Sequence, residues 1–212
     1  MASSNAPRGF VLAKKVGSGA NSTGVNNKSV RPYAAVVPSG LIPSNLFTGD
    51  PVYVDAAGTV APLASGGEGK ITGVFQGVSY VNADGDAKFA KNWTGGSTAT
   101  DVKVFICDDP DQTYFVQADA TCTAAAGWEG MSSRNVPVLQ GAGGSTITGL
   151  SSFQLDASAI TVAGAQARII RRAPWDEGIG SSAGATDAYP WWEVRLNYHV
   201  DNFITCTISV SS

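Results

Sequence analysis

Charged residues are scarce in this sequence. Asp, Glu, Lys and Arg together make up 15% of its 212 residues, and the formal net charge is −3. A mildly acidic surface repels phosphate backbones, so the composition argues against a nucleic-acid partner. The one basic stretch, "RIIRRAPW" at residues 168–175, sets three arginines among apolar neighbours and is too weak a patch to change this expectation.

Long hydrophobic runs are missing as well. No stretch is long enough to span a bilayer, and the N-terminal stretch "MASSNAPRGFVLAKK" has no apolar run of the kind that a signal peptide needs. We therefore expect no membrane partner, and synthesis in a cytoplasm.

Histidine and cysteine are rare. His199 is the only histidine, and it falls on the polar side of a strand-like pattern with no nucleophilic serine context, so we expect an exposed strand residue and no catalytic base. The three cysteines, Cys107, Cys122 and Cys206, are odd in number and lack ligand spacing, which favours buried thiols over metal or redox roles.

These absences predict a protein with no catalytic residues, no metal and no cofactor, and therefore not an enzyme. The one catalytic arrangement that the sequence leaves open is the carboxylate pair of a glycoside hydrolase. No acidic pair stands out from the acids of the turn clusters, however.

Turn-forming residues, in contrast, are abundant, with 25 glycines and 10 prolines. From Arg31 onward, short β-type runs alternate with turn clusters, and nothing resembles a βαβ unit, so the expected fold class is all-β with short antiparallel strands and hairpins. The predicted strands lie in "PYAAVV", "PVYV", "TVAPL", "KITGVFQGVSYV", "KFA", "DVKVFI" and "TYFVQAD". Only "TAAAGW" at residues 123–128 suggests a short helix.

The clearest pattern lies at the C-terminal end. From Trp192 to Val210, mostly apolar residues at even positions alternate with mostly polar residues at odd positions. This period of two predicts strands with one buried and one solvated face. The alternation is interrupted at Asn202 and Phe203, and the turn-prone "DN" at residues 201–202 predicts a turn between two such strands.

Four glycine- or acid-rich stretches resemble ligand loops. "NLFTGDPVYVDAAGTVAPL" at residues 45–63 reads as a hairpin, in which Gly49 and Asp50 turn Pro51 into a strand. "SGGEGKITG" precedes a strand pattern, whereas a phosphate loop precedes a helix, so a hairpin loop is expected. "DDPDQ" and "NADGD" offer oxygen ligands for Ca²⁺ but lack the rest of a calcium loop, so turns are expected.

The domain organisation predicted from composition has two parts. Residues 1–31 include the Gly/Ser/Asn-rich "VGSGANSTGVNNKSV" and are expected to form an extended arm that orders only against another surface. Residues 32–212 are expected to form one all-β domain, either undivided or split into two β sub-modules near residues 120–150.

Six stretches in this order resemble a family of tailed-bacteriophage virion proteins, the capsid decoration or cement proteins. They are "NAPRGFVLAKKVGSG", "LFTGDPVYVDAAGTV", "GVFQGVSYVNADGDAKFAKNW", "DVKVFICDDPDQTYFVQAD", "QARIIRRAPWDEG" and "WWEVRLNYHV". The region "GWEGMSSRNVPVL" and the Trp-Trp pair are individual to this chain, so no contact is carried over to them.

The resemblance implies a β-barrel or β-tulip core, no catalytic residues, and a homo-oligomer, commonly a trimer, that stabilises the outer surface of an icosahedral capsid by bridging subunits. The implied partners are the major capsid protein and further copies of this chain, and the implied location is the virion. The candidates for capsid or oligomer contacts are the apolar residues of the arm and the C-terminal tryptophans: Pro7, Phe10, Val11, Leu12, Trp175, Trp191 and Trp192.

A second hypothesis is a carbohydrate-binding or host-adhesion module of a head or tail fibre. It rests on Trp175, Trp191, Trp192 and Tyr189, whose rings could form a platform for sugars. The same residues suit a core or a subunit interface, which the sequence analysis favours.

Overall fold

The computed structural model of this protein describes residues 4–15, 30–37, 42, 44–54, 58–64, 70–95, 98–123, 134–141, 143–160, 164–176 and 186–200. Four sequence predictions lie outside these residues: the short helix in "TAAAGW" beyond its first residue, the glycines of "SGGEG", Cys206, and the second C-terminal strand.

The all-β prediction is confirmed. The described residues contain no α-helix, and their only helical turn is the 3-10 turn η3 (Ala157–Ala159). The strands are β1 (Val11–Lys15), β2 (Val30–Val37), β3 (Leu46–Phe47), β4 (Pro51–Val54), β5 (Val60–Pro62), β6 (Gly73–Val81), β7 (Ala87–Ala90), β8 (Asn92–Trp93), β9 (Thr100–Cys107), β10 (Gln112–Gln117), β11 (Thr121–Thr123), β12 (Asn135–Val136), β13 (Val138–Leu139), β14 (Gln154–Leu155), β15 (Ala167–Arg172), β16 (Thr186–Ala188) and β17 (Trp191–Leu196).

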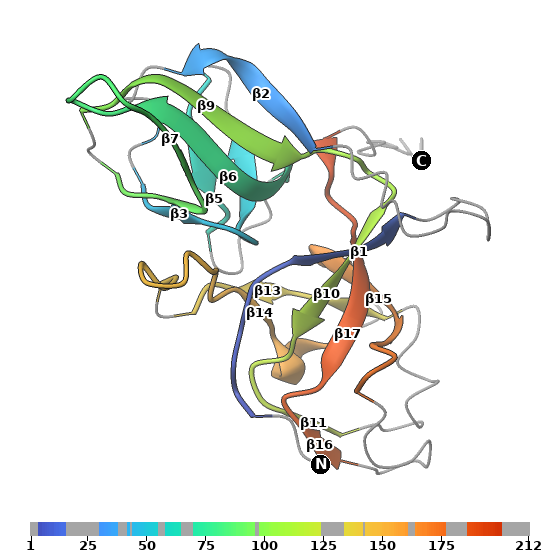
Figure 1. Cartoon of the computed structure of the whole chain (residues 1–212). Coiled ribbons are helices and arrows are strands. Elements are labelled where there is room, and N and C mark those ends of the chain that lie inside the picture. The colour runs from blue at the N-terminus through green and yellow to red at the C-terminus, as the bar shows by residue number, and fades with distance from the viewer. Residues whose placement is uncertain are drawn as a thin grey trace, which may run out of the picture.

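Two larger antiparallel sheets dominate the structure and lie in separate lobes (Figure 1). The upper lobe in that view holds a six-stranded sheet with the order β2-β9-β6-β4-β5, in which β7 pairs with β6. The lower lobe holds a five-stranded sheet with the order β1-β10-β17-β15-β12. The remaining strands form three short two-stranded pairs, β3-β8, β11-β16 and β13-β14.

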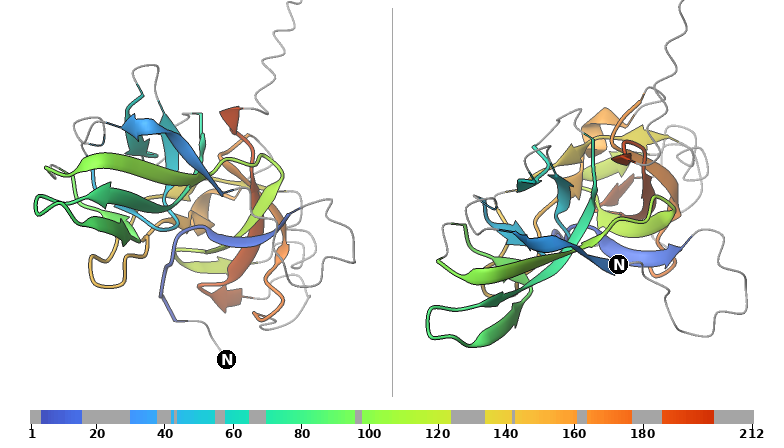
Figure 2. Two further views of the ribbon diagram at one scale, coloured as in Figure 1. Left: turned by 45° about the horizontal axis from the view of Figure 1, so that its top comes forward. Right: turned by 90° about the horizontal axis from the view of Figure 1, so that it is seen from above.

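None of the sheets in the described residues closes on itself, so the barrel-like or tulip-like core stays a prediction. The chain begins in the five-stranded sheet with β1, passes through the six-stranded sheet from β2 to β9, and returns to the five-stranded sheet at Gln112. This return lies N-terminal to residues 120–150, where the sequence analysis placed a division into sub-modules. Figure 2 shows the two sheets lying side by side in both additional views.

The predicted hairpins are present. β4 and β5 pair antiparallel, with Val54 opposite Val60, and Gly58 adopts the left-handed conformation (φ 82°) that the hairpin interpretation requires. "NADGD" forms the turn between β6 and β7, where Gly85 also has a positive φ. Pro110 lies between β9 and β10, where it interrupts no ladder.

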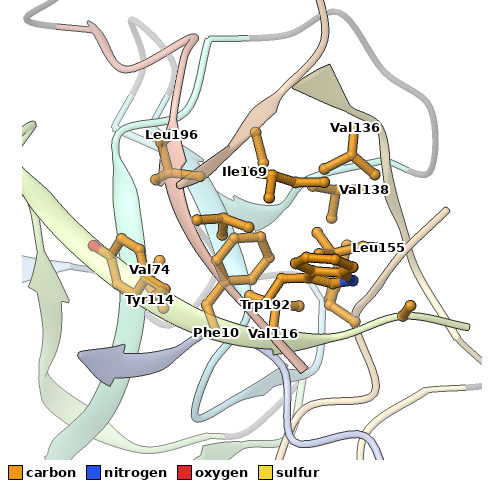
Figure 3. Close-up of a cluster of buried hydrophobic side chains, with 14 of the residues drawn as sticks. Phe10, Val74, Tyr114, Val116, Val136, Val138, Leu155, Ile169, Trp192 and Leu196 are labelled. Carbon is orange, nitrogen blue, oxygen red and sulfur yellow. The ribbon is translucent and has the colours of Figure 1, made fainter. Parts of the chain in front are cut away.

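Buried side chains form two clusters. One packs inside the first lobe around Phe75, Val104 and Trp93. The other fills the second lobe around Tyr114 and Trp192, and its labelled members converge in Figure 3. Val74 of β6 belongs to this second cluster, so the first sheet contributes directly to the core of the second lobe.

Part of the predicted extended arm, residues 4–15, lies against the rest of the chain. Phe10 is 1% exposed and packs edge-on against Tyr114, with ring centroids 5.7 Å apart. β1 is an edge strand of the five-stranded sheet, with Val11 opposite Phe115. Residues 4–15 are therefore part of the folded body, because Phe10 fills a place in its core (Figure 3). Residues 1–3 and 16–29 of the predicted arm lie outside the described residues.

The alternation at the C-terminal end holds only in part. Trp192, Val194 and Leu196 are buried as predicted, but Glu193 of the predicted solvated face is also buried, because its carboxylate is hydrogen-bonded to Thr113 and Arg171. His199, predicted to be exposed, is 1% exposed, because β17 ends at Leu196 and the chain then pairs with Ile71, which shifts the alternation.

Thr48–Asp50 connects the two lobes. The Gly49 carbonyl accepts from the Phe10 N–H (2.9 Å), and the Phe75 N–H donates to the Asp50 carbonyl (2.9 Å). Gly9, with φ 65°, lies so close that an added Cβ would meet the Gly49 carbonyl oxygen at 2.5 Å and the Ser151 side chain at 2.4 Å. We name residues Thr48–Asp50, with Gly9 packed on them, the junction.

Substituting Gly9 by alanine should destabilise the protein by about 3 kcal/mol or more, because left-handed strain adds to steric overlap with backbone. Gly143→Ala is the matched control: its φ is 96°, but an added Cβ meets nothing within 4 Å, so a loss of about 1 kcal/mol is expected. Urea unfolding of both variants measures the difference. Equal losses would contradict the close packing at the junction.

Candidate binding surface around Trp175 and Trp191

The tryptophans of the sequence hypothesis separate into two roles. Trp192 is 1% exposed and belongs to the core cluster, whereas Trp175 is 63% exposed and Trp191 is half-buried. β17 explains the split, because neighbouring residues of a strand point to opposite faces of the sheet. Trp175 follows β15, and its ring packs on Phe115 at a centroid distance of 4.3 Å.

The other contact candidates separate in the same way. Phe10 is in the core, so neither Phe10 nor Trp192 can contact another protein while the chain is folded. Pro7 and Leu12 are half-buried, and Val11 is 39% exposed. The candidates that keep exposed surface lie along the N-terminal segment and β1, and at the two outer tryptophans.

A pocket of about 420 Å³ lies where these outer residues meet. The described residues that line it are Ser4, Ala6, Arg8, Val11, Trp175 and Trp191. One wall is therefore the extended N-terminal segment, and the other consists of the two indole rings. Tyr189, which the sequence hypothesis grouped with the tryptophans, is half-buried and is not among these lining residues.

Buried glutamines hold the N-terminal wall in place. Gln117 of β10 is 1% exposed; its Oε1 accepts from the Ala6 N–H (2.9 Å), and its Nε2 donates to the Ser4 carbonyl (2.8 Å). The Nε2 of Gln154 donates to the Asn5 side chain (3.0 Å). A buried amide that serves both a donor and an acceptor of the same segment fixes that segment in one register.

Arg8 is the charged group among the described lining residues. The carboxylates nearby in the sheet are engaged elsewhere. Glu193 accepts from Arg171 Nε (2.5 Å) and from the Thr113 hydroxyl (2.8 Å). Asp176 accepts from the Trp191 N–H (2.5 Å). The pocket therefore combines flat apolar surface with one positive charge.

A second hollow of about 250 Å³ adjoins the pocket, since Arg8 and Val11 line both. Gln76 of β6 also lines this hollow, and its Nε2 is a buried donor with no hydrogen-bond partner among the described residues. The pocket and the hollow together extend from Trp175 to the junction at Gly49.

Two further apolar side chains are exposed away from the pocket, and the sequence analysis missed both. Ile147 is 96% exposed at the tip of the Ser145–Gly149 turn, which is closed by the Gly149 N–H donating to the Ser145 carbonyl (2.7 Å). Phe89 of β7 is 66% exposed. The exposure of Ile147 could have been predicted from the sequence, because an isoleucine inside the turn cluster "GGSTITGL" has few apolar neighbours to pack against. The exposure of Phe89 had no such signal.

Asp50 lies in the turn before β4, as the sequence analysis predicted. It is 3% exposed, and its Oδ2 accepts from the Phe47 N–H (2.8 Å). Burial raises the pKa of the carboxyl to about 6, although hydrogen bonds from Ser151 and Phe47 oppose this. Asp50 also lines a separate cavity of about 450 Å³ between the two lobes, next to Phe47 and Phe153.

The cysteine prediction is confirmed for Cys107 and Cys122, which are buried free thiols. Burial raises the pKa of Cys122 to about 11, so this thiol stays protonated at neutral pH. Among the described residues, no group of three or more His, Cys, Asp and Glu side chains is placed to hold a metal ion. The same part of the chain contains no helix of the length and apolarity that crossing a membrane requires.

No family model, no curated protein and no solved structure matches this chain, so these comparisons assign it to no family.

The free energy of unfolding should decrease as the pH is raised from about 4 to about 6, because the carboxyl group of Asp50 ionises in this range. Its pKa is higher in the folded state (about 6) than the usual 3.8, so the folded state binds an extra proton in this range. Ionisation above pH 6 then costs about 3 kcal/mol. Asp50→Asn should remove this fall, because asparagine keeps an acceptor for the Phe47 N–H without the charge.

Urea unfolding of the wild type and of Asp50→Asn at pH 4 and pH 7 gives the free energy of unfolding of each protein. The wild type should lose stability relative to Asp50→Asn between pH 4 and pH 7. Asp101→Asn, at an exposed position, controls for the loss of one negative charge. A stability difference between wild type and Asp50→Asn that is the same at both pH values would refute a raised pKa.

Proposed function

We propose that this protein is a structural virion protein of the decoration type, which binds the outer surface of an icosahedral phage capsid and stabilises it by bridging capsid subunits. The six ordered stretches that resemble decoration proteins support this proposal. The all-β fold agrees with the fold class expected for that family.

The structural observation that carries the proposal is the exposed Ile147. A fully exposed isoleucine at the tip of a closed turn is a rigid apolar projection, and it gains free energy only when another surface covers it. Gly149 at the base of this turn packs against the Lys91 side chain, close to the end of β7, which carries Phe89. Ile147 and Phe89, here named the projecting pair, are convex contacts suited to hollows between capsid subunits.

Stabilisation would follow from linkage. A protein that binds the assembled shell, and not its separated subunits, shifts the disassembly equilibrium towards the shell. The binding energy would be concentrated in a few desolvated apolar anchors such as the projecting pair. No catalytic group is required for this function.

Capsid binding is tested by sedimenting the purified protein with undecorated capsids and by measuring the heat resistance of the shell. The wild type should bind saturably and raise the temperature of capsid disruption. Ile147→Ser and Phe89→Ser should each weaken binding about tenfold or more, because both remove a desolvated anchor. Both positions are exposed, so the fold should persist.

Trp175→Ala is the matched control, since it truncates an exposed aromatic residue that lies away from both Ile147 and Phe89, after β15. A wild type that does not bind saturably would refute the decoration proposal. Loss of capsid binding in Trp175→Ala alone would contradict the role of the projecting pair and would indicate that the surface around Trp175 contacts the capsid.

The resemblance implies that the purified protein is a homo-oligomer, commonly a trimer. A trimer would have a mass of about three times 21.8 kDa. Light scattering after size exclusion measures this mass directly. A monomer over the micromolar range would contradict the trimer without affecting capsid binding.

A second candidate function is carbohydrate binding for host adhesion. The pocket between the N-terminal segment and the two outer tryptophans favours it, because indole faces stack on sugar rings and the pocket is large enough for a small ligand. Val11 of β1 and Trp191 of β17 line this pocket, and both strands belong to the sheet of the lower lobe, whereas β7 belongs to that of the upper lobe (Figure 1). Both functions can therefore belong to one protein.

A further inference from the structure

The pocket beside Trp175 has the shape and charge of a site for one class of ligand. We propose that it binds an acidic saccharide, whose sugar ring stacks on the indoles of Trp175 and Trp191 and whose carboxylate pairs with the guanidinium of Arg8. This inference rests on the carbohydrate-binding function proposed above and specifies its ligand. It does not depend on capsid binding, which is assigned to the projecting pair.

The apolar part of the site is built for stacking. Trp175 keeps 63% of its surface exposed although its ring is held on Phe115, so an aromatic face is presented to solvent in a defined position. The backbone of Trp191 is held in β17, where its N–H donates to the buried Asp176. An aromatic side chain has only two rotatable χ angles, so it loses little conformational entropy when a ring stacks on it.

The charge of the site selects an anion. Arg8 is the charged residue among the described lining residues, and Glu193, the buried carboxylate two positions after Trp191 in β17, is paired with Arg171. A guanidinium binds a carboxylate through two parallel hydrogen bonds, which fixes the orientation of the ligand. One guanidinium is enough to pair with the carboxylate of one uronic-acid unit.

The adjoining hollow indicates that the ligand is longer than one sugar. Arg8 and Val11 line both spaces, and Gln76 lines the second one. The second space therefore has an amide side chain among its lining residues, which suits the hydroxyl groups of a further sugar. An oligosaccharide lying over Arg8 would reach both the tryptophans and Gln76.

The N-terminal segment makes the site possible. Ser4, Ala6 and Arg8 all lie on this segment, and the amide of Gln117 holds it against β10. Because Phe10 anchors the same segment in the core, Arg8 is held two residues from a fixed point. The site is thus formed before ligand binding, which reduces the entropic cost of binding.

Isothermal titration of the full-length protein with trigalacturonate tests the inference, with the methyl ester of the same trisaccharide as the matched ligand. The acid should bind saturably and at least tenfold more tightly than the ester, and its affinity should fall as salt is raised. Trp175→Ala should weaken binding of both ligands about tenfold. Arg8→Gln should weaken binding of the acid and bring it to the level of the ester.

Ile147→Ser is the control variant and should bind the acid as the wild type does, because Ile147 is not among the residues that line either space. Circular dichroism confirms that each variant is folded. Gln76→Ala should weaken binding of the trisaccharide but not of monomeric galacturonate.

The outcomes separate the two levels of the proposal. Equal affinity for acid and ester, still lost in Trp175→Ala, would overturn the acidic specificity and leave carbohydrate binding standing. No saturable binding of either ligand would overturn both. Binding that survives Trp175→Ala and Arg8→Gln would place the saccharide elsewhere and refute the site.

Discussion

The arrangement of the two lobes depends on the short junction Thr48–Asp50. Its backbone bonds to Phe10 of the N-terminal segment, to Phe75 of β6 and, through Thr48, to Gly149 and Ser151 of the second lobe. Gly9 is packed too closely for any side chain, so the crossing of the chains is sterically defined. A carboxyl buried at this crossing makes its stability sensitive to pH.

The junction also connects the core to the two candidate surfaces. By anchoring the N-terminal segment it positions Arg8, which supplies the charge of the pocket. The Thr48 N–H of the junction donates to the Gly149 carbonyl and the Thr48 carbonyl accepts from the Ser151 N–H, so the Ile147 turn is held near β7. A convex apolar projection suits a hollow in a large assembly, whereas a charged concave pocket suits a small ligand, and the molecule presents one of each.

Local features could be predicted from the sequence because their causes are local. The β4–β5 hairpin, the left-handed Gly58 and the ladder break near Pro110 follow from backbone preferences of a few residues. The prediction failed where distant segments decide burial: Phe10 fills a core made by other strands, and His199 is buried where the chain pairs with Ile71. The candidate site was half predicted, since Trp175 and Trp191 were singled out but Arg8 and Gln76 were not.

The amino-acid sequence by itself determined the all-β class, the positions of most strands and the burial of two thiols, because alternation and turn chemistry act between near neighbours. Only the tertiary structure decided which tryptophan enters the core and which remain outside. It also decided that residues 4–15 of the predicted arm contribute a strand, a core side chain and the wall of a pocket. The physical reason is that burial and pocket formation depend on contacts between residues more than 100 positions apart, such as Ala6 with Gln117 at a separation of 111.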